Sequence, residues 1–109
     1  MDAHLRYIKE YFRNSQIRWR QHALARMMER GISRKDVKNA VAEGEIIESY
    51  ADSKPYPGCL VFGYSEETPI HVVVSIDMNS EIAYVITSYV PDTTHFEVDL
   101  KTRKKGGRK

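Results

Sequence analysis

The chain has 109 residues, of which 41% are hydrophobic, and this suits a single domain that buries one core without a disulfide or a structural metal. Its single cysteine, Cys59, excludes an internal disulfide and fits a reducing compartment. No run approaches the roughly 20 apolar residues of a membrane-spanning helix, and the N-terminus lacks the pattern of a secretion signal. We therefore expect a soluble, cytoplasmic protein without membrane contact.

The formal net charge of +2 conceals an uneven distribution of charge along the chain. Residues 1–38 carry ten Lys/Arg and four Asp/Glu, whereas residues 39–100 carry only Lys54 against eleven acids. Residues 101–109 add six positive charges and no acid, so we expect a single domain over 1–100 followed by a basic, disordered tail. Basic helices and a basic tail suit a polyanion, although a solvated surface would give the same pattern.

Helical patterning is confined to the first part of the chain. Three helices are predicted, over residues 2–13, 20–30 and 34–43. The second should end at Gly31, because glycine tolerates the left-handed conformation at a helix end. Ser33 followed by Asp36 resembles a capping box and predicts the start of the third helix. Residues 17–19 are expected to form a short extended link.

After Gly44 the pattern changes to alternating β-branched and aromatic residues, which is typical of strands. Four strands are predicted, over residues 46–50, 59–64, 70–76 and 82–89. The short links at 65–69 and 78–80 permit only hairpins, so the sheet should be mainly antiparallel. The predicted fold class is α+β, with the N-terminal helices packed on one face of a mainly antiparallel four-stranded sheet.

The last hairpin places a histidine on the sheet. If residues 78–80 form the turn, His71 lies across from Thr87, and Tyr89 projects from the same face. The alternate residues are then expected on the core face: Val72, Val74, Ile82, Tyr84 and Ile86. A register slip by one residue would remove this polar patch, and a strand histidine can also be half-buried and satisfied by a neighbour.

The second predicted helix carries the clearest chemical pattern. His22, Arg26 and Arg30 are spaced four residues apart, so at about 100° per residue they fall within an arc of roughly 80°. Arginine binds phosphate through a planar fork of donors, so this face can hold a phosphate. A surface histidine without a function would look the same in sequence. The opposite arc is assigned to the core: Leu24, Met27 and Met28.

Other chemistries find little support in the sequence. The chain has no Cys-x-x-Cys or His-Glu-x-x-His spacing, so no metal is expected. It also has no glycine-rich phosphate loop and no Gly-x-Ser-x-Gly elbow, and no cofactor is expected.

Several motifs together resemble a known group of proteins. They are His22-x-x-x-Arg26-x-x-x-Arg30-Gly31-Ile32, Gly44-Glu45-Ile46-Ile47, Tyr50, Pro57-Gly58-Cys59-Leu60-Val61, Ile70-His71-Val72-Val73 and Val85-Ile86-Thr87-Ser88-Tyr89-x-Pro91. Over residues 17–100 the chain resembles an uncharacterised bacterial family of small proteins. That family is related to ribonuclease toxins of the RelE and BrnT types and is often thought to be paired with a zinc-finger antitoxin of the YgiT/MqsA type.

The resemblance implies a RelE-like α+β domain that acts as the toxin of a type II toxin–antitoxin system, as a metal-independent endoribonuclease on mRNA. Such an enzyme needs a base for the 2′-hydroxyl, cations for the phosphate and an acid for the departing 5′-oxygen. We assign His22 and His71 as base and acid in either order, because histidine titrates near neutral pH. Arg26 and Arg30 are assigned as phosphate clamps, and Tyr89 as a hydroxyl near the scissile group.

One departure leaves an alternative open. Thr87, Ser88 and Tyr89 stand where the RelE toxins carry a lysine/arginine set at the end of the last strand. A non-catalytic RNA- or protein-binding module of the same fold would fit the sequence as well. The expected partners are RNA, including ribosome-bound mRNA, and a cognate antitoxin of the zinc-finger type. The acidic strands could also dock a second copy of the chain, giving a homo-oligomer.

Overall fold

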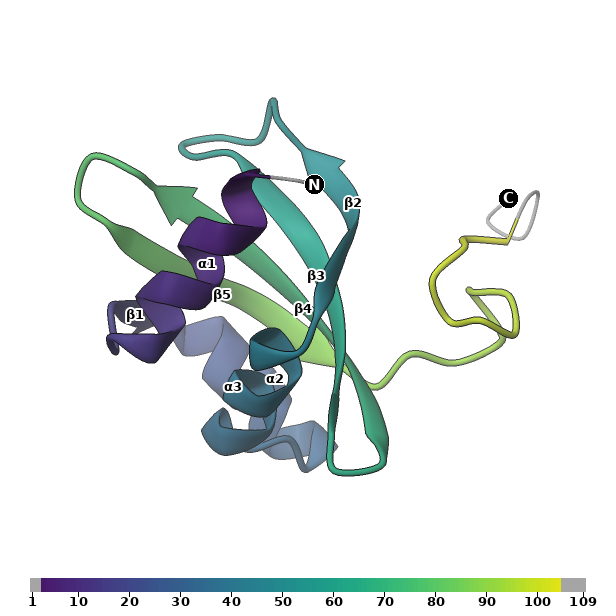
Figure 1. Cartoon of the computed structure of the whole chain (residues 1–109). Helices are drawn as coiled ribbons and strands as arrows, with labels where there is room; N and C mark the ends of the chain where they lie inside the picture. The colour runs from purple at the N-terminus through teal and green to yellow at the C-terminus, as the bar shows by residue number, and fades with distance from the viewer. Residues whose placement is uncertain (1–2, 105–109) are drawn as a thin grey trace.

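The computed structural model describes residues 3–104 and has three helices and five strands in that range (Figure 1). The elements are α1 (Ala3–Arg13), β1 (Ile17–Trp19), α2 (Gln21–Arg30), α3 (Arg34–Ala42), β2 (Glu45–Tyr50), β3 (Gly58–Ser65), β4 (Thr68–Asp77) and β5 (Ile82–Tyr89). The helices pack on one sheet in the strand order β1-β5-β4-β3-β2, which is antiparallel except for β1. The fold is therefore α+β, as predicted. Within the described residues, no helix has the length and apolar character needed to cross a membrane.

The predicted helix boundaries are confirmed within one or two residues, because local signals set them. Gly31 ends α2 in the left-handed region at φ 71°, and its N–H donates to the carbonyls of Met27 and Met28. Ser33 and Asp36 form the expected capping box, in which each side chain accepts a hydrogen bond from the other residue's backbone N–H. These two signals fix the turn between α2 and α3.

The sheet has five strands rather than the four expected. The segment 17–19, expected to be a link, pairs in parallel with β5, with Ile17 opposite Ala83 and Trp19 opposite Val85. A three-residue strand carries almost no alternation signal, and its partner lies far along the sequence. Only the tertiary pairing identifies β1 as a strand.

The expected register of the last hairpin is wrong by two residues. His71 pairs with Tyr89 rather than with Thr87, because the turn is one residue longer than expected, with Asp77 opposite Ile82, and the register shifts by one more residue between Val73 and Val74. A bulge inserts one unpaired residue and turns the following side chains to the other face.

The core face follows from this register. Val72 and Val74 are fully buried as predicted, and Ile76 joins them. On β5 the core residues are Ala83 and Val85, whereas the predicted core residues are only half-buried: Ile82, Tyr84 and Ile86. In α2 the prediction is confirmed for Met27 and partly for Leu24. It is wrong for Met28, which is 83% exposed.

Helix α3 lies close to strand β3. A Cβ atom added to Gly63 would lie 1.9 Å from the carbonyl oxygen of Ala40, so only glycine permits this approach. The Ser65 hydroxyl donates to Asp36 at 2.7 Å and accepts from the Asn39 amide at 3.1 Å. These contacts fix α3 against the β3–β4 hairpin.

A C-terminal strap, which we define as residues 91–104, follows β5. It packs on the face of β4 that carries His71. The residues that alternate with His71 along β4 point to the other face, toward the helices. The strap includes Lys101 and Arg103, which pair with Glu45 and Glu48. The packed chain thus continues through Lys104, beyond the boundary at residue 100 that the sequence indicated. Residues 105–109 of the predicted tail lie outside the described residues.

Candidate functional site

The site is built where the end of β5 meets β4. His71 is fully buried, and its ring packs edge-on against Phe62 and Phe96, with centroids 5.3 and 4.7 Å away. Tyr89, its partner in the β4–β5 ladder, has its ring centroid 5.3 Å from the imidazole. The predicted association of His71 with Tyr89 is therefore present in the structure.

The hydrogen bonds of His71 define its tautomer. Nε2 lies 2.7 Å from the carbonyl oxygen of Leu100, which can only accept, so Nε2 carries the proton. Nδ1 is then left to accept from the Tyr89 hydroxyl at 3.4 Å. Burial lowers the pKa of His71 and outweighs the opposing effect of the bond to Leu100. The ring is therefore neutral near pH 7 and orients the Tyr89 hydroxyl.

The strap is fastened over this histidine by one aromatic ring and one ion pair. Phe96 is 2% exposed, and the Arg103 guanidinium lies 4.8 Å from the centre of its ring. Arg103 also donates to both oxygens of Glu48, from Nε at 2.9 Å and from Nη2 at 3.0 Å. Glu48 accepts a further hydrogen bond from the hydroxyl of Tyr50, whose pKa is raised to about 12, first by burial. The strap is thus tied to the middle of β2.

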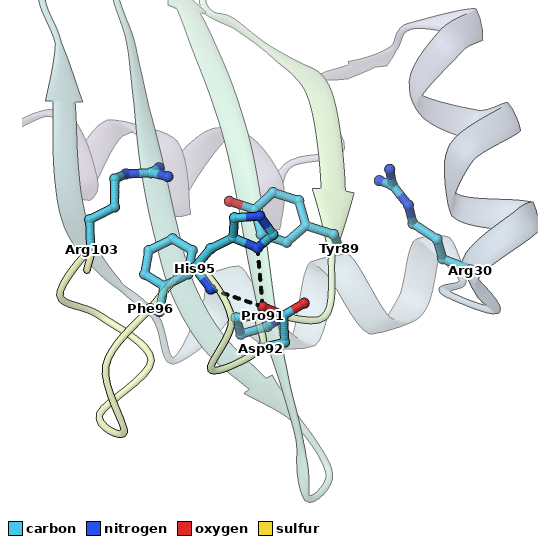
Figure 2. A pocket seen from close by; sticks show the side chains of 7 residues that line it. All are labelled: Arg30, Tyr89, Pro91, Asp92, His95, Phe96 and Arg103. Atoms are coloured by element: carbon cyan, nitrogen blue, oxygen red, sulfur yellow. Dashed lines mark hydrogen bonds and ion pairs between the residues drawn. The ribbon is translucent and has the colours of Figure 1, made fainter. Parts of the chain in front are cut away.

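A pocket of about 340 Å³ opens between the strap and the end of α2. It is lined by Arg30, Tyr89, Pro91, Asp92, His95, Phe96 and Arg103. Figure 2 shows the two arginines on opposite sides of this pocket, one from α2 and one from the strap. We call it the strap pocket. Arg103 is already paired with Glu48, so Arg30, which binds only uncharged groups among residues 3–104, is the guanidinium that favours an anionic ligand here.

His95 and Asp92 form a pair at the mouth of the strap pocket. The Asp92 carboxylate lies 3.2 Å from Nδ1 of His95, and the same oxygen accepts from the backbone N–H groups of Thr94 and His95. The hydrogen bond from the His95 side chain is the first cause that lowers the pKa of Asp92. Because Asp92 contacts Nδ1, Nε2 is the ring nitrogen of His95 that is left to meet a ligand.

Arg30 is anchored at the opposite wall. Its Nη1 donates to the carbonyl oxygen of Ser88 at 2.8 Å and lies 3.5 Å from the Thr87 hydroxyl. The guanidinium has five donors, so most of them stay available to a ligand. Arg30 thus lines the strap pocket, and its role as a phosphate clamp stays a prediction.

The other predicted residues of the α2 face lie away from the strap pocket. His22 is exposed in the first turn of α2, eight residues before Arg30, which is about 12 Å along a helix axis. Arg26 is also exposed and pairs with Glu29 at 3.5 Å. The structure does not bring His22 together with His71, and the roles assigned to these histidines stay predictions.

Sequence reasoning missed four of the seven residues that line the strap pocket. Asp92 and His95 have the i, i+3 spacing of a local pair, so the sequence did contain a weak signal for them. Phe96 and Arg103 gave none, because their partners His71 and Glu48 lie far along the chain. Among the described residues, no group of three or more His, Cys, Asp or Glu side chains is arranged to hold a metal.

The comparisons with known proteins give one result. A family described as a domain of unknown function, DUF4258, matches residues 19–90. No curated protein and no solved structure matches the chain, so a RelE-like fold stays a prediction. The matched range contains Arg30, His71 and Tyr89, whereas the strap and most of the N-terminal region lie outside it.

Proposed function

The chain belongs to the DUF4258 family, and we propose that it is a metal-independent endoribonuclease that cleaves mRNA as the toxin of a type II toxin–antitoxin system. The observation that carries this proposal is the strap pocket. Two arginines, a carboxylate-bound histidine and a tyrosine hydroxyl line a single cavity. These are the groups that RNA cleavage needs when no metal takes part.

The proposed step is attack of the ribose 2′-oxygen on the adjacent phosphorus. His95 accepts the proton of the 2′-hydroxyl, and its bond to Asp92 stabilises the imidazolium that forms. Arg30 binds the phosphate oxygens as negative charge builds up. The bond from phosphorus to the 5′-oxygen breaks, giving a 2′,3′-cyclic phosphate and a 5′-hydroxyl.

Tyr89 is the proposed acid for the departing 5′-oxygen. Burial raises the pKa of Tyr89, so its hydroxyl is protonated at neutral pH. His71 has a positioning role here: its Nδ1 accepts from that hydroxyl at 3.4 Å before the step, and the hydroxyl must turn this single proton from Nδ1 to the 5′-oxygen as the bond to phosphorus breaks. The base thus moves from His22 or His71, as assigned from the sequence, to His95.

The test is cleavage of a synthetic RNA oligonucleotide in the presence of a chelator. We expect His95→Ala to lower kcat about 10²- to 10⁴-fold, the usual contribution of a positioned base. Arg30→Ala should also lower the rate, whereas His22→Ala, at an exposed histidine outside the pocket, is the matched control and should cleave at the parental rate. Parental activity in His95→Ala would refute the assignment. Induced expression should arrest growth for the parent and not for His95→Ala.

A non-catalytic RNA-binding module is the second candidate. It is favoured by the openness of the site, because the His95 and Asp92 side chains are 68% and 60% exposed and so are not shielded from water. In that case the chain would bind RNA without cleaving it, and Arg30→Ala would weaken binding while His95→Ala would leave it unchanged. A cognate antitoxin, of the zinc-finger type in the resemblance, is the proposed protein partner. A second copy of the chain is proposed for the acidic strands.

A further inference from the structure

A second cavity, of about 290 Å³, lies between helices α1 and α3. It is lined by Lys9, Phe12, Arg13, Lys38 and Ala42 and shares no residue with the strap pocket. We call it the helix pocket. Three of its five lining residues are cations and none is an acid.

Within the part of the chain that the structure describes, the three cations of the helix pocket have no ion-pair partner. Among residues 3–104, no carboxylate oxygen lies within 4.0 Å of the charged nitrogens of Lys9, Arg13 or Lys38. Like charges around one cavity repel one another, and an anion between them relieves this repulsion. Phe12, at 7% exposed, and Ala42 add apolar surface beside the cations. The cavity therefore suits a ligand that carries a negative group next to an apolar one.

Two further exposed cations stand in the chain between Arg30 of the strap pocket and Lys38 of the helix pocket. Arg30 ends α2 in the strap pocket, and α3 then begins with Arg34 and Lys35 and reaches Lys38 one turn later. All four side chains are exposed, and Arg34 also lies over the ring of Trp19 at 5.8 Å. Lys38 follows Arg34 by four residues and Lys35 by three on α3, so these three charges lie on one side of that helix, and Arg30 precedes them across the turn at Gly31.

We infer that the helix pocket binds a backbone phosphate of the same single-stranded RNA whose scissile group sits in the strap pocket, with the intervening strand lying along α3. This inference rests on the proposed function. Alternating phosphates and flat bases are the ligand that a chain of cations with an apolar surface recognises without regard to sequence. The helix pocket would set how long a strand the protein holds and would contribute affinity rather than chemistry.

The test is the salt dependence of binding to an uncleavable 2′-O-methyl RNA strand of about 12 nucleotides, a length within the usual site sizes for single strands. The triple variant Lys9→Gln/Arg13→Gln/Lys38→Gln should reduce the slope of log affinity against log salt by about 0.7, the contribution of the one single-strand phosphate contact that it removes. A trinucleotide, which is too short to leave the strap pocket, should bind the parent and the variant equally.

The matched control is Arg6→Gln/Arg18→Gln/Lys54→Gln, which removes the same charge at exposed positions outside both pockets. It should leave the slope close to the parental value. An equal loss of slope in both triple variants would mean a general charge effect and would overturn the inference. An unchanged slope in the helix-pocket variant would also overturn it. So would a helix-pocket variant that binds RNA like the parent but has lost binding to polyglutamate, because that result would indicate an acidic protein partner.

This experiment separates the inference from the proposed function. Cleavage is tested at His95 with a natural RNA, whereas the helix pocket is tested with a strand that cannot be cleaved. If His95→Ala cleaves at the parental rate but the slope still falls in the helix-pocket variant, the catalytic proposal fails and the strand-binding surface stands.

Discussion

At the scale of single residues, the buried imidazole of His71 makes stability depend on pH. Because burial lowers its pKa in the folded chain below the ordinary value of 6.5, the unfolded chain takes up a proton first as the pH falls. Full stability is present above about pH 6.5 and is lost progressively as the pH falls toward the folded pKa. We expect the denaturation midpoint in urea to decline over this range.

His71→Gln is the variant that checks this prediction. It removes the titrating ring and keeps an amide that can donate to the Leu100 carbonyl, so it should be less stable than the parent but lose the decline just below pH 6.5. His22→Ala, which removes an exposed histidine, should keep the parental pH profile. If His71→Gln retains the decline, His71 is not its source. Losses at lower pH belong to carboxylates such as Asp36, whose pKa is lowered first by the Ser33 backbone N–H.

Residue-scale reasoning predicted part of this arrangement. His71 and Tyr89 do lie on one face, as predicted, but simple alternation is not the reason: Ala83 and Val85 of β5 face the core, and only the bulge between Val85 and Thr87 turns Tyr89 to the side of His71. The partner across the ladder was wrong, since nothing local in the sequence marks the longer turn or this bulge. The neutrality of His71 depends on Leu100 and Phe96, which meet it only in the folded chain.

At the scale of elements, the packing of α3 on β3 depends on a single missing side chain. Gly63→Ala would place its Cβ 1.9 Å from the Ala40 carbonyl oxygen, so helix and strand must separate. Overpacking of a core typically costs about 1–3 kcal/mol and occasionally more. Since the obstacle is backbone, we expect a loss at or above the upper end of that range in chemical denaturation.

Gly31→Asn is the matched control for Gly63→Ala. Gly31 has no atom within 4 Å of a built Cβ, and its φ of 71° is one that asparagine tolerates at a helix end. This variant should lose only a small part of the stability. Equal losses in the two variants would show that conformational freedom, and not the close approach to Ala40, decides the cost at Gly63.

The elements differ in how far the sequence predicts them. The helices were predicted well because their caps, such as Ser33 with Asp36, are made within four residues. The long strands were predicted by alternation. Strand β1 and the strap were not, because β1 is three residues long and the strap is held by Phe96 and Arg103 against residues far along the chain.

At the scale of the whole molecule, the family match and the folded unit do not coincide. The match covers residues 19–90, but the core also includes Ile8, Tyr11 and Phe12 from α1. Beyond the match, Phe96 of the strap is 2% exposed and covers His71. The folded unit therefore needs segments on both sides of the matched range.

A fragment of residues 19–90 should consequently fail to fold cooperatively, whereas a fragment of residues 1–104 should keep the stability of the full chain. Burial of one large apolar side chain contributes about 1.5–3 kcal/mol. Loss of the three α1 side chains and Phe96 thus removes an amount comparable with a typical total stability of about 5–15 kcal/mol. Thermal unfolding followed by circular dichroism distinguishes the outcomes. A sharp transition in the short fragment, near the parental midpoint, would mean that α1 and the strap are accessory; its absence would mean that the matched range needs α1 and the strap in order to fold.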